Sequence, residues 1–159
     1  MDISIVVPVY NVEKYIVRCL DSIFSQQFSG TFEVIAIDDA STDGSLQVLQ
    51  DYRSKEDRLT VIVHDTNKRL SIARTTGMKA AKGDYIMHVD SDDWLMPNAL
   101  EDLFSHCKKT SADVVEFGVI SKDNAGNTRS IFQIRKELFT TDKLSVGDDF
   151  FQCAVNKIV

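Results

Sequence analysis

The sequence predicts an α/β domain with a mostly parallel sheet and helices on both faces. Short apolar segments alternate with amphipathic segments about four times before residue 110, which is the pattern of a parallel α/β sheet. The apolar segments are continuous and rich in Val and Ile, as strands buried on both faces are. The length of 159 residues, 43% hydrophobic and 26% charged, fits one globular domain.

Four parallel strands are expected at residues 3–7, 32–37, 59–64 and 85–89. Pro8 is expected to end the first, because proline has no N–H for the ladder. Apolar residues recur at three- and four-residue intervals in the segments between and after these strands, which predicts helices. The predicted stripes are Tyr15, Ile16, Cys19, Leu20, Ile23 and Phe24; then Leu46, Leu49 and Tyr52; and, later, Ala99, Leu100, Leu103, Phe104 and Cys107.

Local signals set the boundaries of the remaining elements. A third helix is predicted over residues 70–81, with Gly83 as a left-handed C-terminal cap. Pro97 is expected to open the fourth helix, as proline can in a first turn. Residues 113–121 and 128–134 predict two strands joined by a turn at 124–127, so a hairpin is expected. A last helix is expected from Thr141 onward, with Thr141 or Asp142 as N-cap.

The net charge and the cysteine content limit the classes of partner and the cellular compartment that we expect. The net charge of -6 argues against nucleic acid and against an acidic membrane surface as partners. The three cysteines, Cys19, Cys107 and Cys153, form no C-x-x-C pair, which favours a reducing compartment and buried thiols. No segment reaches the ~20 apolar residues of a membrane span, and the N-terminus lacks the basic region of a signal peptide. A cytoplasmic domain is expected, and contact with the inner membrane surface would come from segments outside this chain.

Polar residues gather where the expected strands end. Ligands bind at the carboxyl ends of strands in open α/β sheets. Two acids, Asp38 and Asp39, end the second strand, and Asp90, Asp92 and Asp93 end the fourth. Five carboxylates approaching one crevice would repel one another, and Mg²⁺ or Mn²⁺ would relieve this while keeping positions for phosphate oxygens. Asp90 and Asp92 are the leading ligands, whereas a solvated or helix-capping role is the alternative for Asp93.

Other residues near these strand ends suit a nucleotide. An ionised Asp39 could accept the imide N–H of uracil, and Tyr10 could stack on that ring, although plain packing of Tyr10 stays open. Arg74 could reach a phosphate or a pyrimidine carbonyl, or could simply extend to solvent. The histidines His64, His88 and His106 share no metal-ligand spacing and are expected to be structural.

Three ordered motifs resemble the family 2 inverting glycosyltransferases of the GT-A fold. Residues 4–11 (SIVVPVYN) are similar to that family's first strand and P-x-Y-N turn, and residues 32–45 to its D-D-x-S-x-D-G-S segment. Residues 85–93 are similar to its D-x-D strand end, followed by Met96-Pro97. The resemblance implies that Pro8, Tyr10 and Asp39 hold the nucleoside, while Asp90 lies near the ribose and diphosphate, Asp92 carries the metal, and Arg74 matches the arginine of an A-R-N-x-G segment.

That resemblance also implies a reaction. A sugar would pass with inversion from a nucleotide-diphosphate sugar, with UDP the expected carrier, to a hydroxyl of a saccharide or lipid-linked saccharide, as in polysaccharide biosynthesis. Arg69 stands where the family has glycine and Thr75 where it has asparagine. A glycine there can serve a turn with positive φ, and Arg69 could add a phosphate contact. The family's catalytic base follows a W-N-K-L-like segment, which residues 154–159 resemble, so the chain is expected to be a single nucleotide-sugar-binding domain, residues 1–159, ending before the base. Asp149 is the alternative base.

Two other classes share part of this pattern. A haloacid-dehalogenase-type phosphotransferase has an apolar strand before D-x-D, but Trp94 stands where that class has Thr or Val. A receiver-type signalling domain would use Asp38, Asp39 and Asp90, with Ser121 and Lys143, yet it leaves residues 8–11 unexplained. A dinucleotide-binding fold is excluded because no G-x-G-x-x-G follows a strand.

Overall fold

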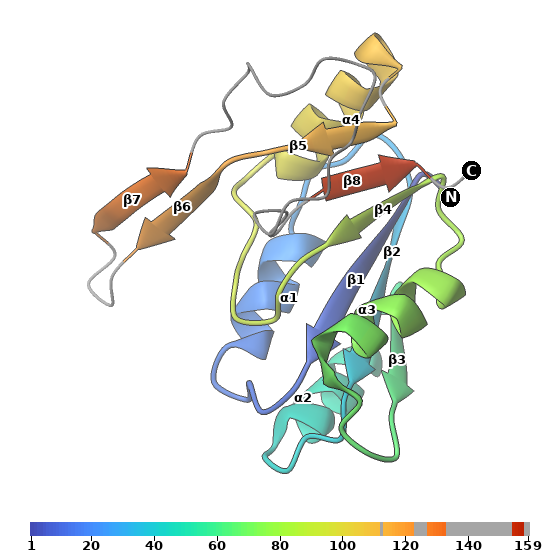
Figure 1. Cartoon of the computed structure of the whole chain (residues 1–159), viewed down its shortest axis with the longest axis vertical. Helices are drawn as coiled ribbons and strands as arrows, with labels where there is room; N and C mark the ends of the chain where they lie inside the picture. Colours follow the sequence, from blue (N-terminus) through green and yellow to red (C-terminus); the bar gives the residue numbers. More distant parts are fainter. Residues whose placement is uncertain (112, 123–126, 133–153, 158–159) are drawn as a thin grey trace.

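The computed structural model describes residues 1–111, 113–122, 127–132 and 154–157. A six-stranded sheet has the order β3-β2-β1-β4-β8-β5, and β6 and β7 form a separate two-stranded sheet (Figure 1). The strands are β1 (Ile3–Val9), β2 (Phe32–Asp38), β3 (Leu59–Val63), β4 (Tyr85–His88), β5 (Val114–Glu116), β6 (Val119–Lys122), β7 (Thr128–Phe132) and β8 (Ala154–Lys157). The helices are α1 (Ile16–Phe24), α2 (Ser45–Arg53), α3 (Arg69–Ala80) and α4 (Ala99–Thr110).

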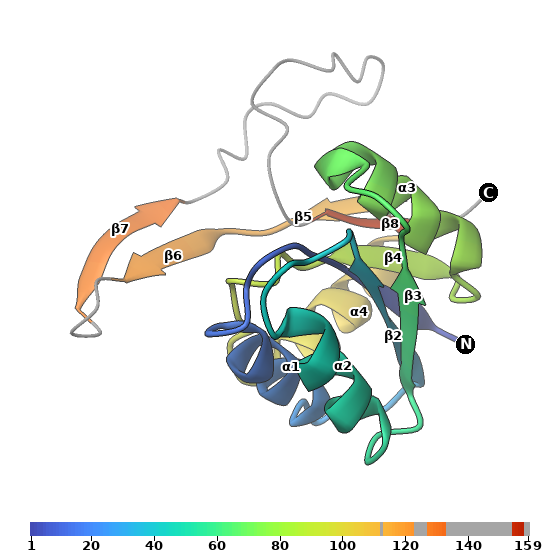
Figure 2. The same cartoon turned by 90° about the horizontal axis from the view of Figure 1, so that it is seen from below.

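The sheet has helices on both faces, as the sequence predicts. Strands β1, β2, β3 and β4 pair in parallel with one another, and α3 lies on one side of the sheet while α1, α2 and α4 lie on the other (Figure 2). Side chains alternate across a strand, so Ile3, Ile5 and Val7 pack in the core on the side of α1, whereas Val6 packs with Ala73 of α3. Burial on both faces explains why β1 is apolar throughout.

The four helices predicted before residue 111 form with boundaries close to those expected. In α1 the stripe Ile16, Cys19, Leu20 and Ile23 is buried as predicted, but Tyr15 is 53% exposed because it precedes the helix and serves as its N-cap. None of the helices in the described ranges is long and apolar enough to cross a membrane.

Pro8 does not end β1. The strand continues to Val9, whose carbonyl accepts the Asp39 N–H at 2.8 Å. Proline lacks only a donor, and the pairing with β2 continues through the next carbonyl. The strand therefore ends at Val9, and the next residue, Tyr10, lies at the edge of the candidate site.

Two boundary predictions around α3 and α4 are wrong. Gly83 is not a left-handed cap, because no positive φ is found there; an added Cβ would instead lie 2.5 Å from the Ser4 nitrogen. This glycine allows the chain to pass close to β1 before β4 begins. Pro97 lies outside α4, since Asn98 is the N-cap with a φ of 64°, a conformation that asparagine tolerates.

The C-terminal part differs most from expectation. The predicted strand at 113–121 is two strands divided at Phe117 and Gly118, of which β5 joins the main sheet and β6 pairs with β7. The predicted hairpin is therefore confirmed for β6 and β7. The helix expected from Thr141 falls partly outside the described residues, and its end is wrong: β8 is an antiparallel strand between β4 and β5, with Val155 opposite Met87.

Candidate functional site

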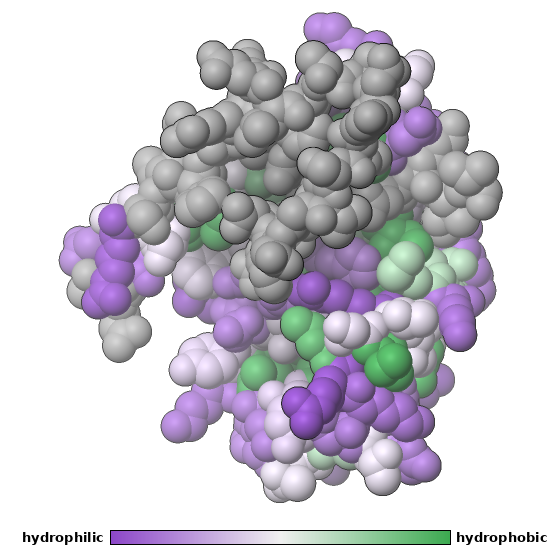
Figure 3. All heavy atoms as spheres, viewed as in Figure 1, coloured by the Kyte–Doolittle hydropathy of each residue, from purple (hydrophilic) through white to green (hydrophobic). Residues whose placement is uncertain are grey.

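A cleft of about 390 Å³ opens at the carboxyl ends of β1, β2 and β4, within the roughly 300–1,000 Å³ of small-ligand sites. Five of the predicted site residues line it, which are Pro8, Tyr10, Asp39, Asp90 and Asp92. The other lining residues are Val9, Asn67, Arg69, Leu70, Ala73 and Ser91. Parallel pairing brings these strand ends together, although they are far apart in the sequence. Figure 3 shows a mixed surface in this view, with hydrophobic residues exposed among hydrophilic ones.

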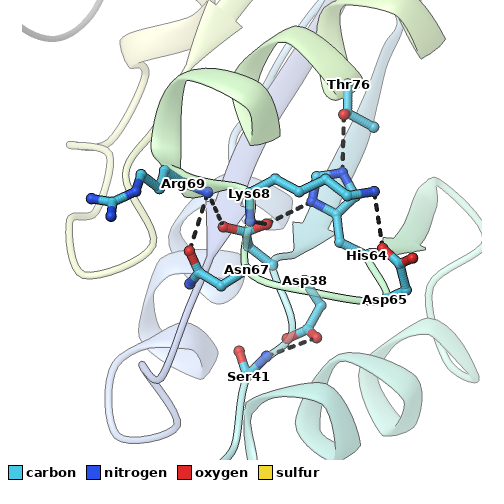
Figure 4. Close-up of polar contacts among 9 residues, drawn as sticks. Asp38, Ser41, His64, Asp65, Asn67, Lys68, Arg69 and Thr76 are labelled. Carbon is cyan, nitrogen blue, oxygen red and sulfur yellow. Dashed lines mark hydrogen bonds and ion pairs between the residues drawn. The ribbon is translucent and has the colours of Figure 1, made fainter.

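Asp39 is the most heavily bonded group of the cleft. It is 3% exposed, and one carboxylate oxygen accepts from His64 Nδ1 at 2.6 Å and from the Lys68 N–H at 2.8 Å. The other oxygen accepts the Arg69 N–H at 2.7 Å (Figure 4). Burial alone would raise its pKa, but the hydrogen bonds from His64, Lys68 and Arg69 together lower it. A carboxylate offers about four acceptor positions, and these donors occupy three of those of Asp39.

His64 is the site residue that sequence reasoning assigned no role beyond structure. It follows β3 and is buried, and its Nε2 lies 3.0 Å from the Thr76 hydroxyl of α3. Because the Asp39 carboxylate can only accept, Nδ1 carries the hydrogen of their bond. The expectation of a structural histidine is confirmed here, but no spacing signal linked His64 to Asp39, since 25 residues separate them.

The other two histidines differ from His64. His88 of β4 has an Nδ1 that is buried and has no hydrogen-bond partner within the described ranges, so the expectation that it is satisfied is not met there. Burial and the nearby Arg74 lower the pKa of His88, against an opposing effect of Asp90. His106 of α4 is exposed.

Arg74 does not simply extend to solvent. Its guanidinium donates to the Asp90 carboxylate at 2.7 Å, and the two side chains are only 23% and 16% exposed. The pair links α3 to the end of β4, so it holds Asp90 at the cleft. Arg74 itself is not among the residues that line the cleft.

The prediction that five carboxylates gather in one crevice is wrong. Asp38 is 1% exposed and faces the turn after β2, where it accepts the Ser41 N–H at 3.2 Å. Asp93 lines a different, more apolar pocket of about 170 Å³ with Trp94 and Phe117, and burial, with Asp92 and Asp90 nearby, raises its pKa. Successive side chains of the loop after β4 thus diverge. Within the described part of the chain no group of three or more His, Cys, Asp or Glu side chains is arranged to hold a metal.

Asp92 and Tyr10 are the exposed members of the predicted site. Asp92 is exposed at the cleft, and Tyr10 is 47% exposed, so neither side chain is buried by packing. The candidate base Asp149 lies outside the described residues.

Arg69 adopts the backbone conformation that glycine would favour. Its φ is 71°, so the turn that a glycine can serve at this position is present here although the residue is arginine. Besides the bond to Asp39, its N–H donates to Asn67 Oδ1 at 3.2 Å.

The family model for Glycosyl transferase family 2 matches residues 4–158. The chain belongs to glycosyl transferase family 2. Membership in this family excludes the haloacid-dehalogenase and receiver alternatives, because the motifs that they shared are explained within one family fold.

Proteins named as glycosyltransferases are similar to this chain over most of its length. Glycosyltransferase GlyG of Streptococcus pneumoniae is 33% identical over 92% of this chain and 48% of its own length. The poly(ribitol-phosphate) beta-glucosyltransferase of Bacillus spizizenii is 38% identical over 84% of this chain and 21% of its own length. The chain thus spans less than half of either relative.

Solved structures agree with the fold. The structure of Staphylococcus aureus TarS 1-349 in complex with UDP is 36% identical, with a TM-score of 0.71 over 78% of this chain and 37% of that one. A mannosyltransferase from Pyrobaculum calidifontis, 24% identical with a TM-score of 0.62 over 76% of this chain and 35% of that one, shares the fold.

Proposed function

We propose that this chain is the nucleotide-sugar-binding part of an inverting glycosyltransferase that uses a UDP-sugar and a hydroxyl acceptor on a saccharide or lipid-linked saccharide. The observation that carries the proposal is the single cleft that brings Pro8, Tyr10, Asp39, Asp90 and Asp92 together. TarS 1-349, which shares this fold, has been solved with UDP and with UDP-GlcNAc. Those ligands support a uridine nucleotide as the donor carrier here.

The cleft also suits a divalent cation that arrives with the donor. Asp92 is an exposed carboxylate, and Asp90 is already paired with Arg74. One or two carboxylates are too few to hold an ion alone, but Mg²⁺ and Mn²⁺ sites of this kind are completed by substrate phosphates. Asp92, with Asp90 beside it, would hold the ion, which would neutralise negative charge on the departing diphosphate.

The chain's own residues account for donor recognition. The exposed Tyr10 ring would stack on the base, and the remaining acceptor position of Asp39 would take the uracil imide hydrogen. Asp39, Asp90 and Asp92 each have a binding role, so no carboxylate of the described cleft is left to serve as the general base that takes the acceptor proton.

Thermal unfolding with a panel of nucleotides tests this function. UDP, GDP and dTDP are each added with and without Mn²⁺, and UDP with Mn²⁺ is expected to give the largest increase in Tm. A ligand present at 100 times its Kd adds ~2.7 kcal/mol to the free energy of unfolding, which is a shift of several degrees for a domain of this size. If no nucleotide-metal pair raises the Tm, the proposed function is wrong.

A further inference from the structure

We propose that Arg69 is a donor-binding residue, whose guanidinium holds the diphosphate of the nucleotide sugar in the cleft that Asp92 also lines. The proposal deepens the proposed function and rests on it. Three observations support it: the backbone conformation of Arg69, the place of its side chain, and the balance of charge in the cleft.

The backbone of Arg69 is held in a conformation that arginine disfavours. A φ of 71° is uncommon outside glycine, asparagine and aspartate. The surrounding structure enforces it, because Asp39 accepts the N–H groups of both Lys68 and Arg69, and Asn67 accepts the latter as well. Glycine at this position would make the same backbone bonds without the steric cost. The steric cost of an arginine at this φ is consistent with a contribution from its side chain.

Arg69 belongs to the cleft in which the donor diphosphate would bind. It lines the cleft together with Asp90, Ser91 and Asp92. Figure 4 shows it extending in the opposite direction from the Lys68 side chain, which forms an ion pair with Asp65 at 3.0 Å. Lys68 is therefore paired with Asp65, whereas the neighbouring Arg69 lines the cleft.

The charges of the cleft leave Arg69 available. Asp39 accepts three hydrogen bonds, and Asp90 pairs with Arg74. Asp92 and Arg69 remain as the charged cleft residues for which the described ranges show no ion pair. A diphosphate carries more negative charge than one divalent ion on Asp92 would neutralise. A guanidinium offers a planar pair of donors that matches phosphate oxygens, and Arg69 supplies it.

Arg69→Gly separates binding from folding, because the proposal expects weaker UDP binding without a loss of stability. The free protein should have an unchanged Tm or one raised by about 2–4 °C as strain is lost. In calorimetric titrations with Mn²⁺ present, the UDP affinity should fall about tenfold to a hundredfold, the usual range for a charged hydrogen-bonded pair. Uridine, which has no phosphate, should bind within twofold of the wild type in an NMR titration.

Three further variants make the result decisive. Arg69→Asn removes the charge in a residue that tolerates positive φ, so it should bind UDP as weakly as Arg69→Gly even if the glycine variant is less stable. Arg69→Lys keeps the charge without the planar fork and should bind with intermediate affinity. Lys79→Gln removes a positive charge from the exposed end of α3 and should leave UDP affinity within twofold.

Two results would overturn the proposal. One is a UDP affinity of Arg69→Gly and Arg69→Asn within twofold of the wild type. The other is an equal loss of UDP and uridine affinity, which would mean that Arg69 acts by shaping the loop. A wild-type chain that binds no UDP with Mn²⁺ would instead refute the proposed function itself.

Discussion

Asp39 is the position at which a single atom change should have the clearest effect on stability. Asp39→Asn keeps the shape of the side chain but replaces one acceptor oxygen with an NH₂ group. The carboxylate accepts from His64 and Lys68 on one oxygen and from Arg69 on the other. An amide therefore leaves at least one of these donors facing another donor, in a site that is 3% exposed.

The cost of Asp39→Asn follows from those contacts. A buried donor left without its acceptor costs about 1–3 kcal/mol, and loss of the charge weakens the bonds that remain. The second acceptor of the Arg69 N–H, Asn67 at 3.2 Å, recovers part of this. We expect the free energy of unfolding to fall by about 2–3 kcal/mol, which lowers the Tm by roughly 4–12 °C.

Urea unfolding followed by circular dichroism at several pH values measures this effect. The pKa of Asp39 is lowered from 3.8, so its stabilisation is fully present above that pH and is lost as the pH falls through the lower folded-state pKa. The difference between wild type and Asp39→Asn should be constant at pH 5–7 and shrink below pH 3.8.

The neighbouring acid provides the control for Asp39→Asn. Asp38 is equally buried, but one of its oxygens has no partner among the described residues and the other accepts only the Ser41 N–H. Asp38→Asn keeps that bond and removes a poorly compensated charge, so its effect should stay below about 1 kcal/mol. Equal effects of the two substitutions, or a difference that does not shrink in acid, would refute the reasoning.

Three other predictions concern the metal, the sheet and a buried thiol. Asp92→Asn should abolish the added Tm increase that Mn²⁺ gives to UDP, while the increase with UDP alone persists; an undiminished Mn²⁺ effect would exclude Asp92 as ligand. Gly83→Ala should lower the free energy of unfolding by more than about 2 kcal/mol, because its Cβ would lie 2.5 Å from the Ser4 nitrogen and 2.7 Å from the Ile3 carbonyl carbon; urea unfolding measures this, and an unchanged midpoint contradicts it. Burial raises the pKa of Cys19 to about 12, so mass spectrometry after thiol labelling at pH 8 should find Cys19 modified only in denaturant, and labelling of the native protein would contradict that burial.

Local patterns in the sequence were sufficient to predict the parallel sheet and the edge at which the cleft opens. Periodicity is a local property, so continuous apolar runs and helical stripes predict β1 to β4 and α1 to α4 within a few residues. Polar residues placed directly after β1, β2 and β4 then lie at one edge of the sheet. Pro8, Tyr10, Asp39, Asp90 and Asp92 line one cleft for this reason, and the role of each in binding stays a prediction.

Which of these groups contact one another depends on long-range packing. The insertion of β8 between β4 and β5 joins segments about 70 residues apart, and no local pattern records such pairing. No local pattern records the hydrogen bonds of His64 with Asp39 and of Arg74 with Asp90 either, because each joins residues of different elements at the edge of the sheet. The direction of a loop side chain is set by its packed surroundings, so Asp92 faces the cleft while Asp93 lines the apolar pocket beside it.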